Sequence, residues 1–362
     1  MGNFLLIGST EPYSGKSAAV LGLAYHLQRQ GIRITYGKPI GSCMEGDCAL
    51  EGDPDLLFMT SALQLTPEQM PPMVLQLTGQ AVLQQMVDPQ PTHYIERLQA
   101  YRQEMPADLA LLEGPADLYE GELFHLSLTE MAEALDSPVL LICRYHSALV
   151  VDSLLAAQKK LTSRLAGVLI NDVPEDQLPS VREQIIPFLE AQGIPVLGIL
   201  PSNRILRSIS VGELAKQLEA DILCCEDRQD FMVEDFVIGA MNVNSALKYF
   251  RKSEHKAVIT GGDRTDIQLA ALETSTVCLI LTGKLPLDER IQARAEELEV
   301  PILSVDLDTF TTIERIERVF GQVRLHETIK VRCIQELMSR NVDFARLYNC
   351  LGLTQPLASG VA

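Results

Sequence analysis

The sequence predicts an α/β protein that has a larger domain with a parallel sheet, followed by a smaller α/β domain. Short, near-continuous apolar runs alternate with helical patterns, which is typical of parallel strands buried on both faces. A glycine-bearing turn joins the first apolar run to the first helical pattern. At 362 residues the chain is too long for one ordinary core, so two domains are expected.

The first domain is predicted to span residues 1–206. Its strands are apolar runs at residues 4–7, 32–36, 109–112, 139–142, 165–170 and 196–200. The spacing of apolar residues between them predicts helices at residues 18–27, 55–62, 79–87 and 93–104. Ligands of a parallel sheet gather at the carboxyl ends of its strands, so the residues that directly follow each strand are the candidate site residues.

The turn at residues 8–17 predicts a phosphate-binding loop that opens a helix. In such a loop, backbone N–H groups and the positive helix end face the anion, Lys16 bridges the outer phosphates and the Ser17 hydroxyl ligates Mg²⁺. The usual motif has a glycine at the place of Thr10, and the alternative is a loop whose glycine only caps the helix. We predict that a nucleotide is held by Thr10, Ser14, Gly15, Lys16 and Ser17.

Polar side chains that follow other strands complete the predicted site. Magnesium bound to nucleotide needs few protein oxygens, so Ser17 with Asp55 and Glu113 would suffice as metal ligands. Lys38 is placed to neutralise a second anion, and the Asn171 amide suits the edge of an adenine. Each has an ordinary alternative, because Asp55 also fits a helix N-terminus, Glu113 a polar strand end and Asn171 a turn.

The composition restricts the class of partner. The chain has 48 acidic and 30 basic residues, a formal net charge of −18, which argues against nucleic acid or an anionic membrane as a partner. Its eight cysteines form no Cys-x-x-Cys pair and several lie in apolar runs, which favours a reducing cytoplasm. We therefore expect a nucleotide, and either an unidentified protein or a small acidic substrate, as partners.

The second domain is predicted to span residues 207–322, after a polar connector. Its strands are predicted at residues 221–223, 257–260, 277–281 and 302–305. Its helices are predicted at residues 211–218, 233–241, 244–250, 267–272, 291–298 and 311–319. Residues 323–362 are expected to form one or two terminal helices and a frayed tail.

A glycine pair in the second domain marks a possible second site. The glycines let the backbone turn tightly after a strand, and the next helix presents free N–H groups, so a small anion is one candidate ligand of Gly262, Asp263 and Arg264. The alternative is structural: Asp263 caps the helix and Arg264 braces a domain or subunit contact.

The first 205 residues resemble dethiobiotin synthetase, and still more the related amino-terminal domain of long bacterial phosphate acetyltransferases. The resemblance rests on ordered motifs at residues 15–17, 37–40, 55–57, 112–114, 167–171 and 197–201. It implies that Lys38 faces an acidic substrate, that Asn171 reads adenine and that the protein is a homodimer. It also implies a Mg-ATP site formed by Lys16, Ser17, Asp55 and Glu113, with Lys16 and Lys38 in the catalytic roles.

One departure concerns the substrate side of that family's site. The synthetases have a glycine-rich run after the acidic strand end, where this chain has residues 114–117, Gly-Pro-Ala-Asp. Pro115 restricts the backbone and has no N–H to donate. The resemblance therefore covers the nucleotide half of the site and does not extend to a dethiobiotin-like substrate.

Residues 208–322 resemble the DRTGG domain, a small regulatory-type module. The resemblance rests on residues 241–243, 261–265, 303–306 and 311–312. In long phosphate acetyltransferases this module follows the nucleotide domain and precedes a catalytic domain, which this sequence does not contain. We therefore expect a cytoplasmic, ATP-binding regulator or sensor with slow or no hydrolysis and no acetyltransferase activity; the alternative is an ATP-dependent, carboxylate-activating ligase.

Overall fold

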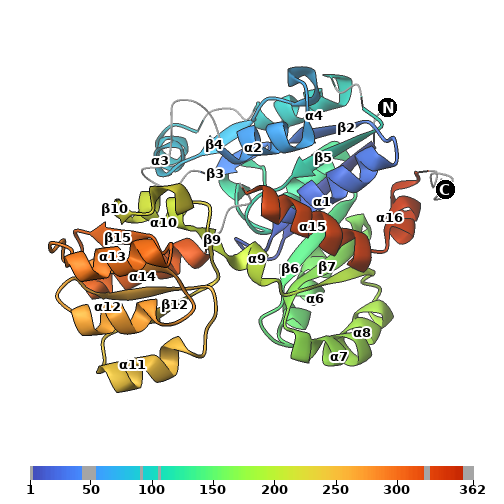
Figure 1. Ribbon diagram of the computed structural model, residues 1–362. Coiled ribbons are helices and arrows are strands. Elements are labelled where there is room, and N and C mark those ends of the chain that lie inside the picture. The colour runs from blue at the N-terminus through green and yellow to red at the C-terminus, as the bar shows by residue number, and fades with distance from the viewer. Residues whose placement is uncertain (1–2, 43–53, 90–92, 105–106, 322–326, 354–362) are drawn as a thin grey trace. The chain divides into compact units, whose positions relative to one another are not determined.

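A six-stranded parallel sheet forms the centre of the first part of the chain (Figure 1). Its strand order is β2-β5-β1-β6-β7-β8. The strands are β1 (Asn3–Ser9), β2 (Ile34–Gly37), β5 (Leu109–Glu113), β6 (Val139–Arg144), β7 (Leu165–Val173) and β8 (Val196–Pro201). Because all of them run in one direction, their carboxyl ends meet at one edge, as predicted from the sequence.

The computed structural model describes residues 3–42, 54–89, 93–104, 107–321 and 327–353. These residues divide into two units, the first made of residues 1–202 with 325–362 and the second of residues 203–324. The expected frayed tail, residues 358–362, lies outside the described residues. No helix in the described ranges combines the length and the apolar character that a bilayer span requires.

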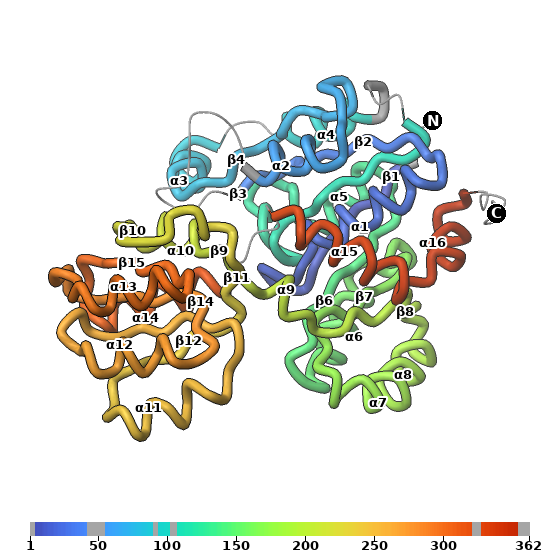
Figure 2. Tube along the Cα trace, viewed as in Figure 1, coloured from blue at the N-terminus to red at the C-terminus, as the bar shows by residue number. Residues whose placement is uncertain are grey.

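Helices cover both faces of the sheet, which explains why its strands are apolar on both sides (Figures 1 and 2). In β1, Leu6 faces a core shared with one helix layer, while Leu5 and Ile7 alternate to the other face. The layer against Leu6 contains α4 (Tyr94–Glu104), α5 (Leu128–Leu135), α6 (Val150–Leu161) and α8 (Ile186–Ala191). The opposite layer contains α1 (Lys16–Arg29), α15 (Thr328–Asn341) and α16 (Phe344–Leu351).

A smaller excursion leaves the sheet between β2 and β5. It contains the short parallel pair β3 and β4, with Ile40 opposite Leu75. Thr78 caps the helix that follows, since its hydroxyl accepts a hydrogen bond from the Ala81 N–H at 3.1 Å. The elements are β3 (Ile40–Ser42), α2 (Pro54–Leu63), β4 (Leu75–Leu77) and α3 (Gly79–Val87).

The carboxy-terminal helices complete the first unit, although the sequence assigned residues 323–362 to a segment of their own. Helix α15 packs on α1 so closely that a Cβ on Gly22 would lie 2.4 Å from the Met338 Cγ. Helix α16 is held by Arg346, whose guanidinium forms two 2.7 Å hydrogen bonds with the Glu190 carboxylate. His26 of α1 stacks on Phe344 of α16, with ring centroids 3.4 Å apart.

Replacing Met338 by alanine is expected to lower the free energy of unfolding of the first unit by about 2–5 kcal/mol, because it opens a cavity under a fully buried side chain. Urea unfolding together with hydrogen exchange of the α1 amides checks the effect. Met86→Ala is the matched control, since Met86 is 65% exposed on α3 and its loss is expected to change little. Equal effects of the two substitutions would contradict this packing.

The second unit has a five-stranded sheet with the order β10-β15-β14-β13-β12, in which only β10 is antiparallel to its neighbour. Its strands are β10 (Asp221–Cys224), β12 (Asp235–Ile238), β13 (Lys256–Gly261), β14 (Thr276–Thr282) and β15 (Ile302–Val305). A separate two-stranded pair is formed by β9 (Ile209–Ser210) and β11 (Met232–Val233). Its helices are α9 (Arg204–Arg207), α10 (Val211–Leu218), α11 (Val243–Phe250), α12 (Thr265–Leu272), α13 (Glu289–Glu297) and α14 (Thr309–Gly321).

The helix predicted at residues 233–241 is wrong, because this segment forms the end of β11 and all of β12. Its apolar residues have helical spacing, but the backbone pairs in parallel with β13, where Phe236 lies opposite Ala257. The pairing continues beyond the strand, since the Gly239 N–H donates to the Ile259 carbonyl at 2.7 Å. Here pairing with a distant strand overrides the local pattern.

Candidate functional site

The loop between β1 and α1 ends in a glycine that occupies the N-cap position of the helix. Gly15 lies immediately before α1 with φ +95°, a conformation that favours glycine. The Asn171 side chain, at the carboxyl edge of β7, lies directly over it, so that a Cβ on Gly15 would be 2.3 Å from the Asn171 Nδ2. The same Nδ2 donates to the Ser14 carbonyl at 2.8 Å. Asn171 therefore braces the loop, a contact that the sequence did not indicate.

Lys16, the first residue of α1, is turned toward the end of β1 and the loop after β5. Its Nζ donates to the Ser9 hydroxyl at 2.9 Å and to the Ala116 carbonyl at 3.3 Å. Burial lowers the pKa of Lys16, an effect that the nearby Glu113 carboxylate opposes. Lys16 is thus held among oxygen atoms at the carboxyl edge of the sheet.

Ser17 and Glu113 are in direct contact. The Ser17 Oγ donates to the Glu113 Oε1 at 2.8 Å, and the second carboxylate oxygen accepts from the Tyr36 hydroxyl at 3.0 Å. Glu113 is only 5% exposed although it ends a strand at the sheet edge. A hydroxyl and a carboxylate oxygen side by side are ligand types that Mg²⁺ accepts. No cluster of three or more His, Cys, Asp and Glu side chains fit for a metal occurs in the described ranges, so a cation here would need nucleotide and water oxygens as well.

The other predicted residues make contacts of their own. Lys38 and Asp55 form an ion pair, with 3.4 Å between Nζ and Oδ2. The Thr10 N–H donates to the Ile142 carbonyl at 3.2 Å, which ties the start of the loop to β6. The Ser14 hydroxyl is buried and has no hydrogen-bond partner in the described part of the chain. Such an orphaned donor inside a phosphate-type loop fits the binding of a polar ligand.

Carboxylates of the loop at residues 114–120 accept hydrogen bonds from three of its own backbone N–H groups. The Asp117 carboxylate accepts from the N–H groups of Tyr119 and Glu120, at 2.7 and 2.8 Å. The Glu120 carboxylate in turn accepts from the Ala116 N–H. Sequence reasoning missed Ser9, Tyr36, Asp117 and Glu120; an Asx-turn pattern was the available signal for Asp117, and the others depend on contacts between distant segments.

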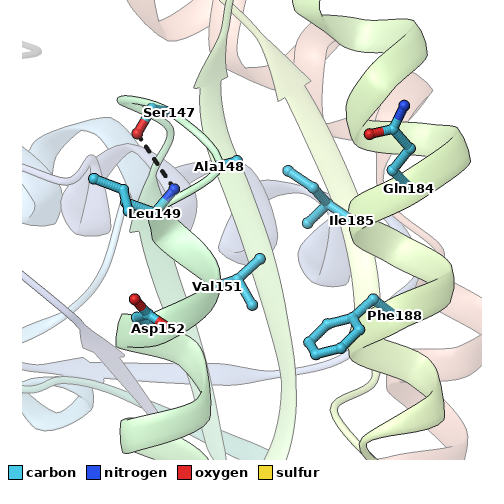
Figure 3. Close-up of a pocket in the computed structure, with 8 residues that line it drawn as sticks. All are labelled: Ser147, Ala148, Leu149, Val151, Asp152, Gln184, Ile185 and Phe188. Carbon is cyan, nitrogen blue, oxygen red and sulfur yellow. Dashed lines mark hydrogen bonds between the residues drawn. The ribbon is translucent and has the colours of Figure 1, made fainter.

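An open apolar groove of about 560 Å³ lies between α6 and the helical segment that ends in α8 (Figure 3). Val151 comes from α6, and Ile185 and Phe188 come from the facing segment. That segment includes a π-helical turn just before Pro187, which has no N–H to donate to the preceding turn. None of the predicted site residues lines this groove.

In the second unit the structure places Gly262, Asp263 and Arg264 after β13. Arg264, rather than Asp263, is the N-cap residue of α12, and it makes no side-chain capping bond. Its guanidinium donates to the Met241 carbonyl at 2.9 Å and lies 3.4 Å from the Asp266 carboxylate. The alternative in which Asp263 caps the helix is therefore not what the structure shows, and Arg264 braces the turn after β12 within the same unit.

A parallel sheet whose first strand leads through a Gly-Lys-Ser turn into a helix defines a P-loop-type α/β protein. The chain belongs to the AAA domain family, whose model matches residues 3–210. A DRTGG domain model matches residues 213–319. These matches confirm the predicted order of a P-loop-type domain followed by a DRTGG domain.

The relatives confirm the resemblance to phosphate acetyltransferases. The phosphate acetyltransferase of Nitratidesulfovibrio vulgaris is 28% identical over 377 residues, which cover 96% of this chain and 51% of that protein. The phosphate acetyltransferase of Synechocystis sp. is 25% identical over 374 residues, which cover 97% of this chain and 52% of that protein. The chain thus spans about half the length of these curated relatives.

A solved structure also matches part of the chain. It contains the CBS and DRTGG domains of the regulatory region of Clostridium perfringens pyrophosphatase, complexed with the activator diadenosine tetraphosphate. It is 21% identical, covers 44% of this chain and 76% of that chain, and has a TM-score of 0.28.

Proposed function

We propose that this chain is a cytoplasmic nucleotide sensor, in which Mg-ATP binds at the carboxyl edge of the first sheet and the DRTGG domain transmits that occupancy to a protein partner. The observation that carries the proposal is the loop before α1, with Gly15 at φ +95° and Lys16 among oxygen atoms. Backbone N–H groups of such a loop and its lysine suit a polyphosphate. When bound, Mg²⁺ would screen the phosphate charge, with Ser17 and Glu113 as its protein ligands.

The proposed roles of the remaining residues follow from their positions. Thr10, Ser14 and Gly15 would line the phosphates, and Asn171 would hold the loop while its amide faces the adenine. Asp55 would be the second carboxylate, after Glu113, that contacts the hydrated cation. Lys38, now paired with Asp55, would compensate the charge of the outermost phosphate.

The loop after β5 favours a sensor over a carboxylate-activating ligase. A ligase of that kind must stabilise a second anion beside the terminal phosphate, and backbone N–H groups are the usual donors. Here Pro115 has none, and the N–H groups of Ala116, Tyr119 and Glu120 are bonded to carboxylates of the same loop. The carbonyl of Ala116, an acceptor, faces Lys16 instead. These contacts engage three of the backbone donors that could otherwise face an acidic second substrate at this place.

A binding and turnover experiment tests the proposal. Calorimetric titration with ATP, with and without Mg²⁺, is expected to show binding that Mg²⁺ strengthens. Phosphate release is then measured against a panel of small carboxylic acids, and the sensor is expected to show slow release that no acid stimulates. Stimulation by a single acid would establish the ligase instead, and absence of ATP binding would reject both. Sedimentation of the same samples tests the proposed homodimer.

A further inference from the structure

The buried carboxylate of Glu113 has a different hydroxyl on each oxygen. Its Oε1 accepts from the Ser17 Oγ at 2.8 Å, and its Oε2 accepts from the Tyr36 hydroxyl at 3.0 Å. Tyr36 is fully buried in β2, and its register partner in β5 is Leu111. Since residues 111 and 113 of one strand point to the same face, the tyrosine reaches diagonally to the strand end.

One hydrogen bond does not fix the plane of the Glu113 carboxylate, so a second contact is needed. The last side-chain torsion of glutamate is broad and is not confined to a staggered well. A bond to Ser17 alone would leave the carboxylate free to rotate about that torsion. The Tyr36 hydroxyl holds the second oxygen and so keeps the first one on Ser17, the second residue of the helix behind the proposed phosphate site.

We propose that Tyr36 is a positioning residue, which fixes the Glu113 carboxylate and thereby sets the affinity of the nucleotide site for a divalent cation. This inference rests on the proposed function, because it assigns a cation to Ser17 and Glu113. Tyr36 itself contacts neither the cation nor the nucleotide. Its effect is expected on the cation dependence of binding and not on the metal-free affinity for ATP.

Tyr36→Phe tests the inference, since phenylalanine retains the ring that fills the core and removes only the hydroxyl. ATP is titrated in the presence of EDTA and then at increasing Mg²⁺. The affinity for ATP in the presence of EDTA is expected to stay within about two-fold of the wild-type value. The Mg²⁺ concentration that gives half of the maximal increase in ATP affinity is expected to rise about five- to ten-fold, as for one lost hydrogen bond. Mn²⁺ is then used in place of Mg²⁺, and its electron paramagnetic resonance signal in the presence of ATP reports the binding of the cation directly.

Tyr101→Phe is the matched control. Tyr101 is also buried in the first unit, where its hydroxyl donates to the Pro72 carbonyl. Its variant is expected to lose stability without a change in cation dependence. A Tyr36→Phe protein with the cation dependence of the wild type would overturn the inference. Wild-type protein that binds ATP with no effect of Mg²⁺ would overturn it as well, and wild-type protein that does not bind ATP would reject the proposed function itself.

A double variant covers the case in which Tyr36→Phe alone does not fold. Glu113→Gln removes the buried charge that would otherwise lose one of its two hydroxyl partners. If Tyr36 acts through Glu113, the double variant is expected to have the same cation dependence as Glu113→Gln alone. A further shift caused by Tyr36→Phe in that background would show that the tyrosine acts by another route.

Discussion

Replacement of Lys16 by alanine is expected to lower the affinity for ATP by about 100-fold or more, because a charge-assisted contact to a phosphate contributes about 3 kcal/mol. The fold is expected to survive. Without the lysine, the Ser9 hydroxyl still donates to the Ala116 carbonyl at 2.7 Å, so the loop after β5 keeps its link to β1. Calorimetric titration with ATP and circular dichroism of the same samples measure the two effects.

Lys159→Ala is the matched control for this variant. Lys159 is exposed in the last turn of α6, and its removal changes the net charge by the same amount. Its affinity for ATP is expected to remain that of the wild type. Normal ATP binding by Lys16→Ala would show that the nucleotide site has been assigned to the wrong loop.

Gly15→Ala is expected to impair both stability and nucleotide binding. At φ +95° an alanine costs about 1–2 kcal/mol in backbone strain alone. Its Cβ would also lie 2.3 Å from the Asn171 Nδ2, so the amide that braces the Ser14 carbonyl must move. Displacing a packed side chain adds about 1–3 kcal/mol. Thermal unfolding and ATP titration check the two consequences.

Gly31→Ala separates these two causes. Gly31 also has a positive φ, +77°, but nothing lies within 4 Å of the place its Cβ would take. The Gly31→Ala variant should therefore show the cost of backbone strain, without the displacement of a packed side chain and without loss of ATP affinity. Adding Asn171→Ala to Gly15→Ala is expected to recover part of the lost stability, because it removes the close contact. Equal destabilisation by Gly15→Ala and Gly31→Ala would exclude a role for the contact with Asn171.

Residues far apart in the sequence meet at the candidate site in ways that no local pattern encodes. The sequence placed Lys16, Ser17 and Glu113 after two separate strands, and the structure makes these strands neighbours and brings Ser17 into contact with Glu113. The partners Tyr36 and Ala116 carry no signal of their own, because a strand tyrosine and a loop carbonyl are ordinary features. Only the alignment of β2 and β5 makes the Tyr36 hydroxyl a partner of Glu113.

The sequence by itself determined the strand-turn-helix unit at residues 3–29, because apolar runs, helical spacing and a Gly-Lys-Ser turn act over a few neighbouring residues. It also determined the order of the two family domains. Only the tertiary structure decided that residues 235–238 form a strand beside β13 and that α15 and α16 return to the first sheet. Both results depend on burial between distant segments, where the gain from packing and pairing exceeds local preference.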